Sequence, residues 1–166
     1  MTVRTGPRGE AFSLLELVIV VVIIGIIAAI AVPRLSRGSG GAADSALTRD
    51  LDVMRTAIEL FATEHKGLLP SDEIVNELTQ YTDVLGEVSE AKDAGHVFGP
   101  YLRQVPPMPV GPRKGKTGVH ICTAAGNTPA QGPADRAWWY NTKTGDLRAN
   151  YDDSVTDAAG KPYNTY

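Results

Sequence analysis

The sequence predicts an α+β protein with a helical N-terminal part and a loop-rich C-terminal part. Residues 17–32 are apolar and uncharged, and apolar side chains recur at helical spacing within residues 43–66. After Gly67, short apolar segments alternate with most of the glycines and prolines, as in a small sheet with long loops. A length of 166 residues fits one domain plus an extension.

Composition excludes several functional classes. The net charge is -3 and the pI about 5.6, so there is no basic excess and no nucleic-acid partner is predicted. Cys122 is the one cysteine, which rules out an intramolecular disulfide. The sequence contains no glycine-rich phosphate loop, nucleophile elbow or paired carboxylates, and we predict no enzyme activity.

The first element is the apolar run that begins at Phe12 and ends at Val32. A helix of this length spans roughly 30 Å, the thickness of a bilayer core. A buried core helix this long would need a much larger domain, so a membrane segment is favoured. Glu16 lies near its start, where a carboxylate is costly and marks a functional site. No cation follows within a helical turn, so a partner would come from another molecule.

Three membrane interpretations are open for this segment. A secretory signal peptide would use Arg4 and Arg8 as its basic region and residues 29–31 as its cleavage site, but the apolar run exceeds the usual 7–15 residues. An ordinary one-pass anchor places Glu16 near the interface without giving it a purpose. The third interpretation gives Glu16 a partner on a second molecule.

The stretch FSLLELVIVVVIIGIIAAIAVP resembles the N-terminal signature of type IV pilins and of the pseudopilins of type II secretion. That pattern has a short basic leader, a Phe, a Glu four residues later, a long apolar helix with a central Gly, and a Pro at its end. The residues at the family's spacings are Phe12, Glu16, Gly25 and Pro33. The resemblance covers about residues 4 to 34. Ala11 departs from it, since the family almost always has Gly there.

The resemblance implies that residues 1–11 are a leader, and that a prepilin peptidase cuts between Ala11 and Phe12 and methylates the new amine. It implies that Glu16 meets the Phe12 amine of a neighbouring subunit. The implied partners are prepilin peptidase, copies of the chain and other pseudopilins, an inner-membrane assembly platform and the lipid bilayer. The leader's basic residues fit cytoplasmic retention, with the globular domain on the periplasmic side.

The next elements form the predicted globular domain, residues 43–166. Pro33 should kink or interrupt the first helix, and residues 34–42 contain RGSGG and should form a flexible linker. Residues 43–66 should form an amphipathic helix that ends at Gly67 and packs on a small sheet. Its apolar stripe is Leu47, Leu51, Met54, Ile58 and Phe61. A second helix is predicted over residues 71–85.

The C-terminal half should hold loops and short strands. Prolines make residues 99–118 an extended surface loop, and strands are predicted over residues 119–122 and 137–141. The second strand should form a hairpin with residues 146–150 around a turn at residues 142–145. Its three aromatic residues are either core residues with one edge residue, or a glycan platform: Trp138, Trp139 and Tyr140.

Two possible cation sites follow from the sequence. The motifs GPYL and WWYN resemble, more weakly, the globular half of major pseudopilins, which implies a long helix packed on a small antiparallel sheet and often a calcium-binding C-terminal loop. Asp152, Asp153 and Asp157 would be the calcium ligands here, unless the tail is simply a solvated acidic segment. His120 and Cys122 are either half of a zinc site or a buried thiol beside a core histidine.

These observations predict a structural subunit of an envelope-spanning filament, with a type II secretion pseudopilin as the first interpretation. A type IV fibre pilin for adhesion or DNA uptake is the nearest alternative, although many such pilins close a C-terminal loop with a disulfide that this chain cannot form. A membrane-anchored periplasmic module that binds glycans through Trp138, Trp139 and Tyr140 is the alternative from another class.

Overall fold

The computed structural model describes residues 13–126, 128–129 and 132–166, without the side chains of residues 30–39. The chain divides into two compact units, Met1–Ser39 and Gly40–Tyr166, each described here by itself. The element order is a long helix, a short helix, five short strands and a final 3-10 turn, so the predicted α+β class is confirmed.

The first helix, α1 (Leu14–Glu64), begins directly after a capping serine. The Ser13 Oγ accepts the Leu15 N–H at 3.3 Å, and the Ser13 carbonyl accepts the Leu17 N–H at 3.1 Å. Glu16 lies in the first turn, where the helix dipole favours a negative charge. Within the part of the chain that the structure describes, no helix combines the length and the apolar character needed to cross a membrane.

The helix α1 is continuous through Pro33 and through residues 34–42. The predicted interruption at Pro33 is therefore wrong for the backbone. Proline removes a single helical N–H donor, and neighbouring turns can carry the helix past that loss. The boundary between the two compact units falls after Ser39, inside the predicted linker, whose flexibility stays a prediction.

The part of α1 in the second unit buries the predicted apolar stripe. All five of its side chains are at most 3% exposed. The helix ends with the Gly67 N–H donating to the Ala62 carbonyl at 2.7 Å, the long hydrogen bond of a Schellman motif. Lys66 (φ 58°) and Gly67 (φ 86°) both adopt the left-handed conformation there. The stripe and the glycine stop signal are both confirmed.

The second helix is much shorter than predicted. The helix α2 covers Ile74–Thr79, and the chain then forms β1 (Tyr81–Thr82) and β2 (Val88–Ser89), an antiparallel pair. The Asp83 Oδ1 accepts the N–H groups of Leu85 and Glu87 at 2.8 and 3.0 Å. This side chain favours a turn over a helix, so the prediction of a helix to residue 85 is wrong.

Three strands form the larger sheet, in the order β3 (Gly118–Cys122), β4 (Arg136–Asn141) and β5 (Leu147–Ala149). The strands β4 and β5 form the predicted antiparallel hairpin. The strand β3, however, runs parallel to β4, so this sheet is mixed. Parallel neighbours need a crossover of a dozen or more residues, and residues 123–135 provide that connection.

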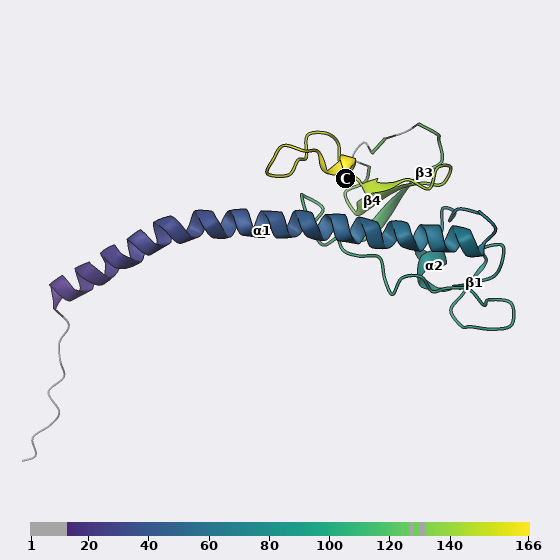
Figure 1. Ribbon diagram of the computed structural model, residues 1–166, viewed down its shortest axis with the longest axis horizontal. Coiled ribbons are helices and arrows are strands. Elements are labelled where there is room, and N and C mark those ends of the chain that lie inside the picture. The colour runs from purple at the N-terminus through teal and green to yellow at the C-terminus, as the bar shows by residue number, and fades with distance from the viewer. Residues whose placement is uncertain (1–12, 127, 130–131) are drawn as a thin grey trace, which may run out of the picture. The chain divides into compact units, whose positions relative to one another are not determined.

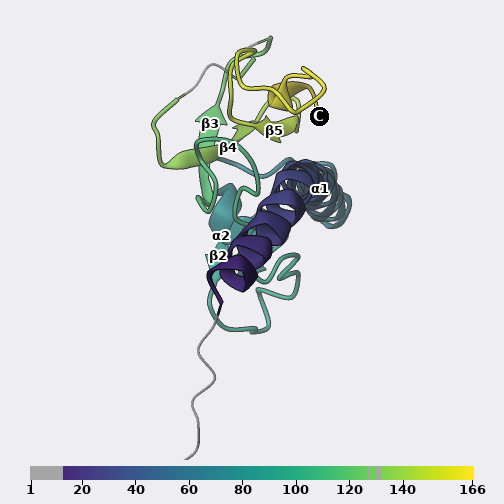
Figure 2. The same ribbon diagram turned by 90° about the vertical axis from the view of Figure 1, so that its left-hand side faces the viewer.

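The second unit folds back along its own part of α1. Figure 1 shows α2 and β1 below the helix and β3 and β4 above it. The view in Figure 2 groups β3, β4 and β5 above α2 and β2. The 3-10 turn η1 (Tyr163–Thr165) near the C-terminal end contacts β5.

The proline-rich loop is part of the core. Its buried apolar side chains are Leu102, Val105, Met108 and Val110. The Trp138 Nε1–H donates to the Pro106 carbonyl at 2.9 Å, which joins the loop to β4. The loop has no regular secondary structure, as predicted, but it covers the sheet instead of only running over the surface.

Candidate functional site

The first candidate site is the start of α1. Glu16 is exposed, and no described residue forms a hydrogen bond or ion pair with its carboxylate. The side chains described in this unit, residues 13–29, include no basic group. Ala11 and Phe12, the predicted cleavage and methylation residues, lie outside the described residues. The structure therefore describes the carboxylate but not its predicted partner.

The rest of the predicted assembly segment is an uncovered apolar helix. Every large apolar side chain from Leu14 to Ile27 is 47–82% exposed. Gly25 lies within this stretch, and a Cβ placed there would meet no atom within 4 Å. The backbone of Pro33 is helical, and its side chain lies outside the described set. A surface of this kind is stable only against lipid or another protein.

The second candidate site is the acidic tail, where each predicted calcium ligand already accepts hydrogen bonds. The Asp152 Oδ1 accepts the Ser154 N–H and O–H at 2.9 and 2.5 Å. The Asp153 Oδ1 accepts the Asn164 Nδ2–H at 2.9 Å. Asp152 and Asp153 thus contact different partners, and among the described residues the aspartates do not gather at one site.

Asp157 accepts three hydrogen bonds. Its Oδ1 accepts the N–H groups of Ala159 and Lys161 at 2.7 and 2.9 Å, and its Oδ2 accepts the Tyr166 O–H at 2.5 Å. The tyrosine hydrogen bond, helped by the backbone donors, lowers the pKa of Asp157. The same bond raises the pKa of Tyr166 to about 12. Asp157 therefore stays ionised and Tyr166 stays neutral over a wide pH range.

The residues of the tail do not fit a calcium ion. Among the described residues, no three His, Cys, Asp or Glu side chains gather where they could hold a metal. Two buried acceptors of the tail, the Asn150 Oδ1 and the Asn164 Oδ1, have no hydrogen-bond partner among the described residues. Two amide oxygens supply two ligands, whereas Ca²⁺ takes six to eight oxygens. We therefore derive no function that depends on calcium.

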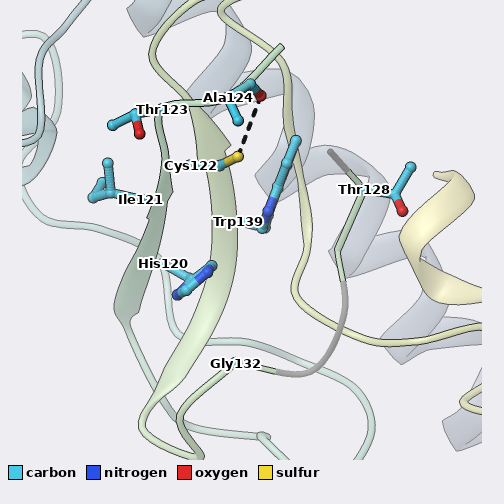
Figure 3. A pocket seen from close by; sticks show the side chains of 8 residues that line it. All are labelled: His120, Ile121, Cys122, Thr123, Ala124, Thr128, Gly132 and Trp139. Atoms are coloured by element: carbon cyan, nitrogen blue, oxygen red, sulfur yellow. Dashed lines mark hydrogen bonds between the residues drawn. The ribbon is translucent and has the colours of Figure 1, made fainter. Parts of the chain in front are cut away.

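The third candidate site is a cavity of about 280 Å³ beside β3, shown in Figure 3. His120, Cys122 and Trp139 line it, and the Cys122 thiol donates to the Ala124 carbonyl at 3.5 Å. The remaining residues that line the cavity are Ile121, Thr123, Ala124, Thr128 and Gly132. None of them is a third zinc ligand, so within the described chain the pair stays an incomplete set.

The aromatic residues of β4 are buried. Trp138 and Tyr140 are fully buried in the core, and Trp139 on the opposite face is 2% exposed. The Tyr140 O–H donates to the Pro70 carbonyl at 2.9 Å. Both faces of the strand are covered, so the interpretation of these residues as an exposed glycan platform is wrong.

Sequence reasoning missed a set of contacts between α1 and the chain that follows it. The Tyr163 O–H donates to the Asp44 Oδ1 at 2.9 Å, and the Tyr101 O–H donates to the Glu64 Oε2 at 2.6 Å. Arg55 donates to the carbonyl oxygens of distant residues. Tyrosines and charged residues are visible in the sequence, but nothing in their spacing predicts these partners.

Comparison with known proteins adds no relative. The chain matches no family model, no curated protein and no solved structure.

Proposed function

We propose that the chain is a structural subunit of a type II secretion or type IV pilus-like filament, in the manner of a pseudopilin. The observation that carries the proposal is a carboxylate four residues after Phe12, at the head of a long uncharged apolar run. Prepilin peptidase would cut between Ala11 and Phe12 and methylate the Phe12 amine.

The helix start supports this reading of Glu16. Ser13 caps α1, so in a processed chain that begins at Phe12 the helix would start almost at the new terminus. A terminal amine and the Glu16 carboxylate would then lie at the same end of the helix. Since no basic side chain is described nearby, the amine of a neighbouring subunit is a fitting counter-charge.

The membrane assignment rests on the sequence of residues 12–33, of which the side chains are described from Ser13 to Ala29. We place this segment in the inner membrane before assembly and in the filament core afterwards. The globular domain would lie on the periplasmic side and form the filament surface. The inner-membrane assembly platform and other pseudopilins would be its partners.

The Glu16 carboxylate would also control the register of assembly. A charge buried at low dielectric without its partner is costly. A subunit that enters one position out of register leaves both Glu16 and a neighbouring amine unpaired. The apolar helix surface would supply most of the association energy, and the charge pair would select the correct stagger.

The test is Glu16→Ala in a secretion host that expresses the peptidase and the assembly platform. We expect cleavage to persist and the amount of sheared filament to fall at least about tenfold, because a lost buried pair costs several kcal/mol. Glu59→Ala is the control, since Glu59 is exposed on the second unit. Normal filaments from Glu16→Ala, or equal loss from both variants, would contradict the proposal.

A further inference from the structure

The C-terminal tail, residues 150–166, is fastened to α1 at two places. The Tyr163 O–H donates to the Asp44 Oδ1 at 2.9 Å, near the start of the second unit. Three turns further along the helix, the Arg55 Nη2 donates to the Tyr166 carbonyl at 2.8 Å. Arg55 also donates from Nε and Nη2 to the Leu147 carbonyl at 3.2 and 2.8 Å, which joins β5 to the same point.

The tail closes on itself between these two places. The Tyr163 N–H donates to the Val155 carbonyl at 3.0 Å, and Thr156 pairs with Pro162 in an antiparallel bridge. The Asp157 carboxylate accepts three donors that follow it in the chain, the N–H groups of Ala159 and Lys161 and the Tyr166 O–H. The loop is thus held by backbone pairing and by one central carboxylate.

A cation of the chain itself completes the tail. The Lys161 Nζ lies 3.7 Å from the centroid of the Tyr166 ring, a cation–π contact. The same tyrosine donates to Asp157, so one ring joins a positive and a negative side chain. Tyr151, Tyr163 and Tyr166 follow one another with ring centroids 6.1 and 5.9 Å apart.

We propose that residues 150–166 form a clamp that fixes the second unit's part of α1 to the rest of that unit and closes without a bound divalent cation. The Tyr166 O–H and the N–H groups of Ala159 and Lys161 supply the hydrogen-bond donors for the Asp157 carboxylate without an ion. A divalent cation at the Asp157 Oδ2 would compete with the Tyr166 O–H. The Lys161 ammonium over the Tyr166 ring adds a like charge to the same loop. The tail's own side chains therefore close the loop that the sequence led us to expect as a calcium site.

Two conservative variants remove single bonds from the clamp. Tyr166→Phe keeps the ring over Lys161 and loses the bond to Asp157, and Tyr163→Phe loses only the bond to Asp44. The full-length chain in mild detergent is melted with excess EDTA and again with millimolar CaCl₂. Tyr81→Phe is the matched control, because the Tyr81 hydroxyl has no hydrogen bond among the described residues.

We expect each clamp variant to lower the Tm by roughly 2–6 °C in both buffers, and Tyr81→Phe to leave it unchanged. The wild-type Tm should be the same with EDTA and with Ca²⁺, since a cation that binds only the folded chain would raise it. Hydrogen exchange should show faster exchange of the Lys161 and Tyr163 amides in the variants.

Two results would overturn the clamp. A Ca²⁺-dependent rise of the wild-type Tm that is lost in Asp153→Asn would assign the loop to a metal. Unchanged Tm and exchange in Tyr166→Phe and Tyr163→Phe would remove the tyrosine bonds from the account. The inference does not depend on the proposed function, because neither measurement involves cleavage or filaments.

Discussion

The two parts of α1 treat their apolar side chains in opposite ways. In the first unit, large apolar side chains from Leu14 to Ile27 are 47–82% exposed. In the second unit, the stripe from Leu47 to Phe61 is at most 3% exposed. Both parts are apolar enough to need a partner, but only the second finds it within its own unit. The buried stripe therefore stabilises the fold of the second unit, whereas the exposed apolar side chains of the first unit are available for association.

The polar contacts show the same contrast. In the second unit, Asp44, Arg55 and Glu64 of α1 each hold a distant part of the chain. In the first unit, Glu16 has no such contact among the described residues. A carboxylate on an exposed apolar helix is the feature that an association site would use.

The largest expected difference between the two parts of α1 comes from replacing one leucine in each part by alanine. Leu51→Ala should destabilise the full-length chain by roughly 2–5 kcal/mol, because Leu51 is 1% exposed and its loss leaves a cavity. Leu17→Ala, at a position 59% exposed, should change the free energy of unfolding by less than about 0.5 kcal/mol.

Urea unfolding in mild detergent measures this difference, with tryptophan fluorescence as the signal, since both tryptophans lie in β4. An equal loss of stability from the two variants would mean that the first part of α1 is buried within the monomer. That outcome would remove the basis for an association surface.

The polar side of the comparison is tested at Arg55. Arg55→Met keeps the length of the side chain and removes its bonds to the Leu147 and Tyr166 carbonyls. We expect a loss of about 1.5–3 kcal/mol, since a charged donor is removed from carbonyl acceptors. Arg49→Met is the control. The Arg49 side chain is 72% exposed, and its Nε lies 3.7 Å from the Asp50 Oδ1, a pair that contributes little to stability. Equal chemical stability of the two variants would contradict a structural role for Arg55.

The smallest expected effect is the pH dependence of the tail. The lowered pKa of Asp157 means stability that is present above the ordinary value of 3.8 and is lost as the pH falls through the lowered one. The pKa of Tyr166, raised to about 12, means stability that is present below 10 and is lost as the pH rises toward 12.

Asp157→Asn should therefore lower the Tm by a constant amount at intermediate pH, and the two curves should converge at both ends. Burial raises the pKa of Glu77, so stability is lost as the pH rises from the ordinary value of 4.5 through the raised one. This contribution is common to both proteins. If the curves of Tm against pH for the wild type and Asp157→Asn stay parallel over the whole range, Asp157 and Tyr166 do not titrate in this way.

Patterns with a fixed period were predictable from the sequence. The spacing of Leu47, Leu51 and Met54 defines a helix face. The aromatic run at Trp138 and the turn residues that follow it indicate a strand and a hairpin. The helix that was expected to reach residue 85 failed because the Asp83 side chain favours a turn, which periodicity does not report.

Long-range contacts were not predictable. The burial of Met108 depends on where the proline-rich loop crosses the sheet, and the Arg55 bonds depend on how β5 and the tail return to α1. The parallel pairing of β3 with β4 likewise depends on the crossover between them. The tail aspartates resembled metal ligands in the sequence, because the sequence does not show which hydrogen-bond donors contact each carboxylate.

The most direct test of the proposed filament subunit is the N-terminus of the mature protein. Intact mass and N-terminal peptide sequencing of protein purified from membranes would determine it in a host with a prepilin peptidase. The account predicts a chain that begins at N-methylated Phe12. A chain that begins at Val32, as after a conventional signal peptide, or one that retains Met1, would contradict it.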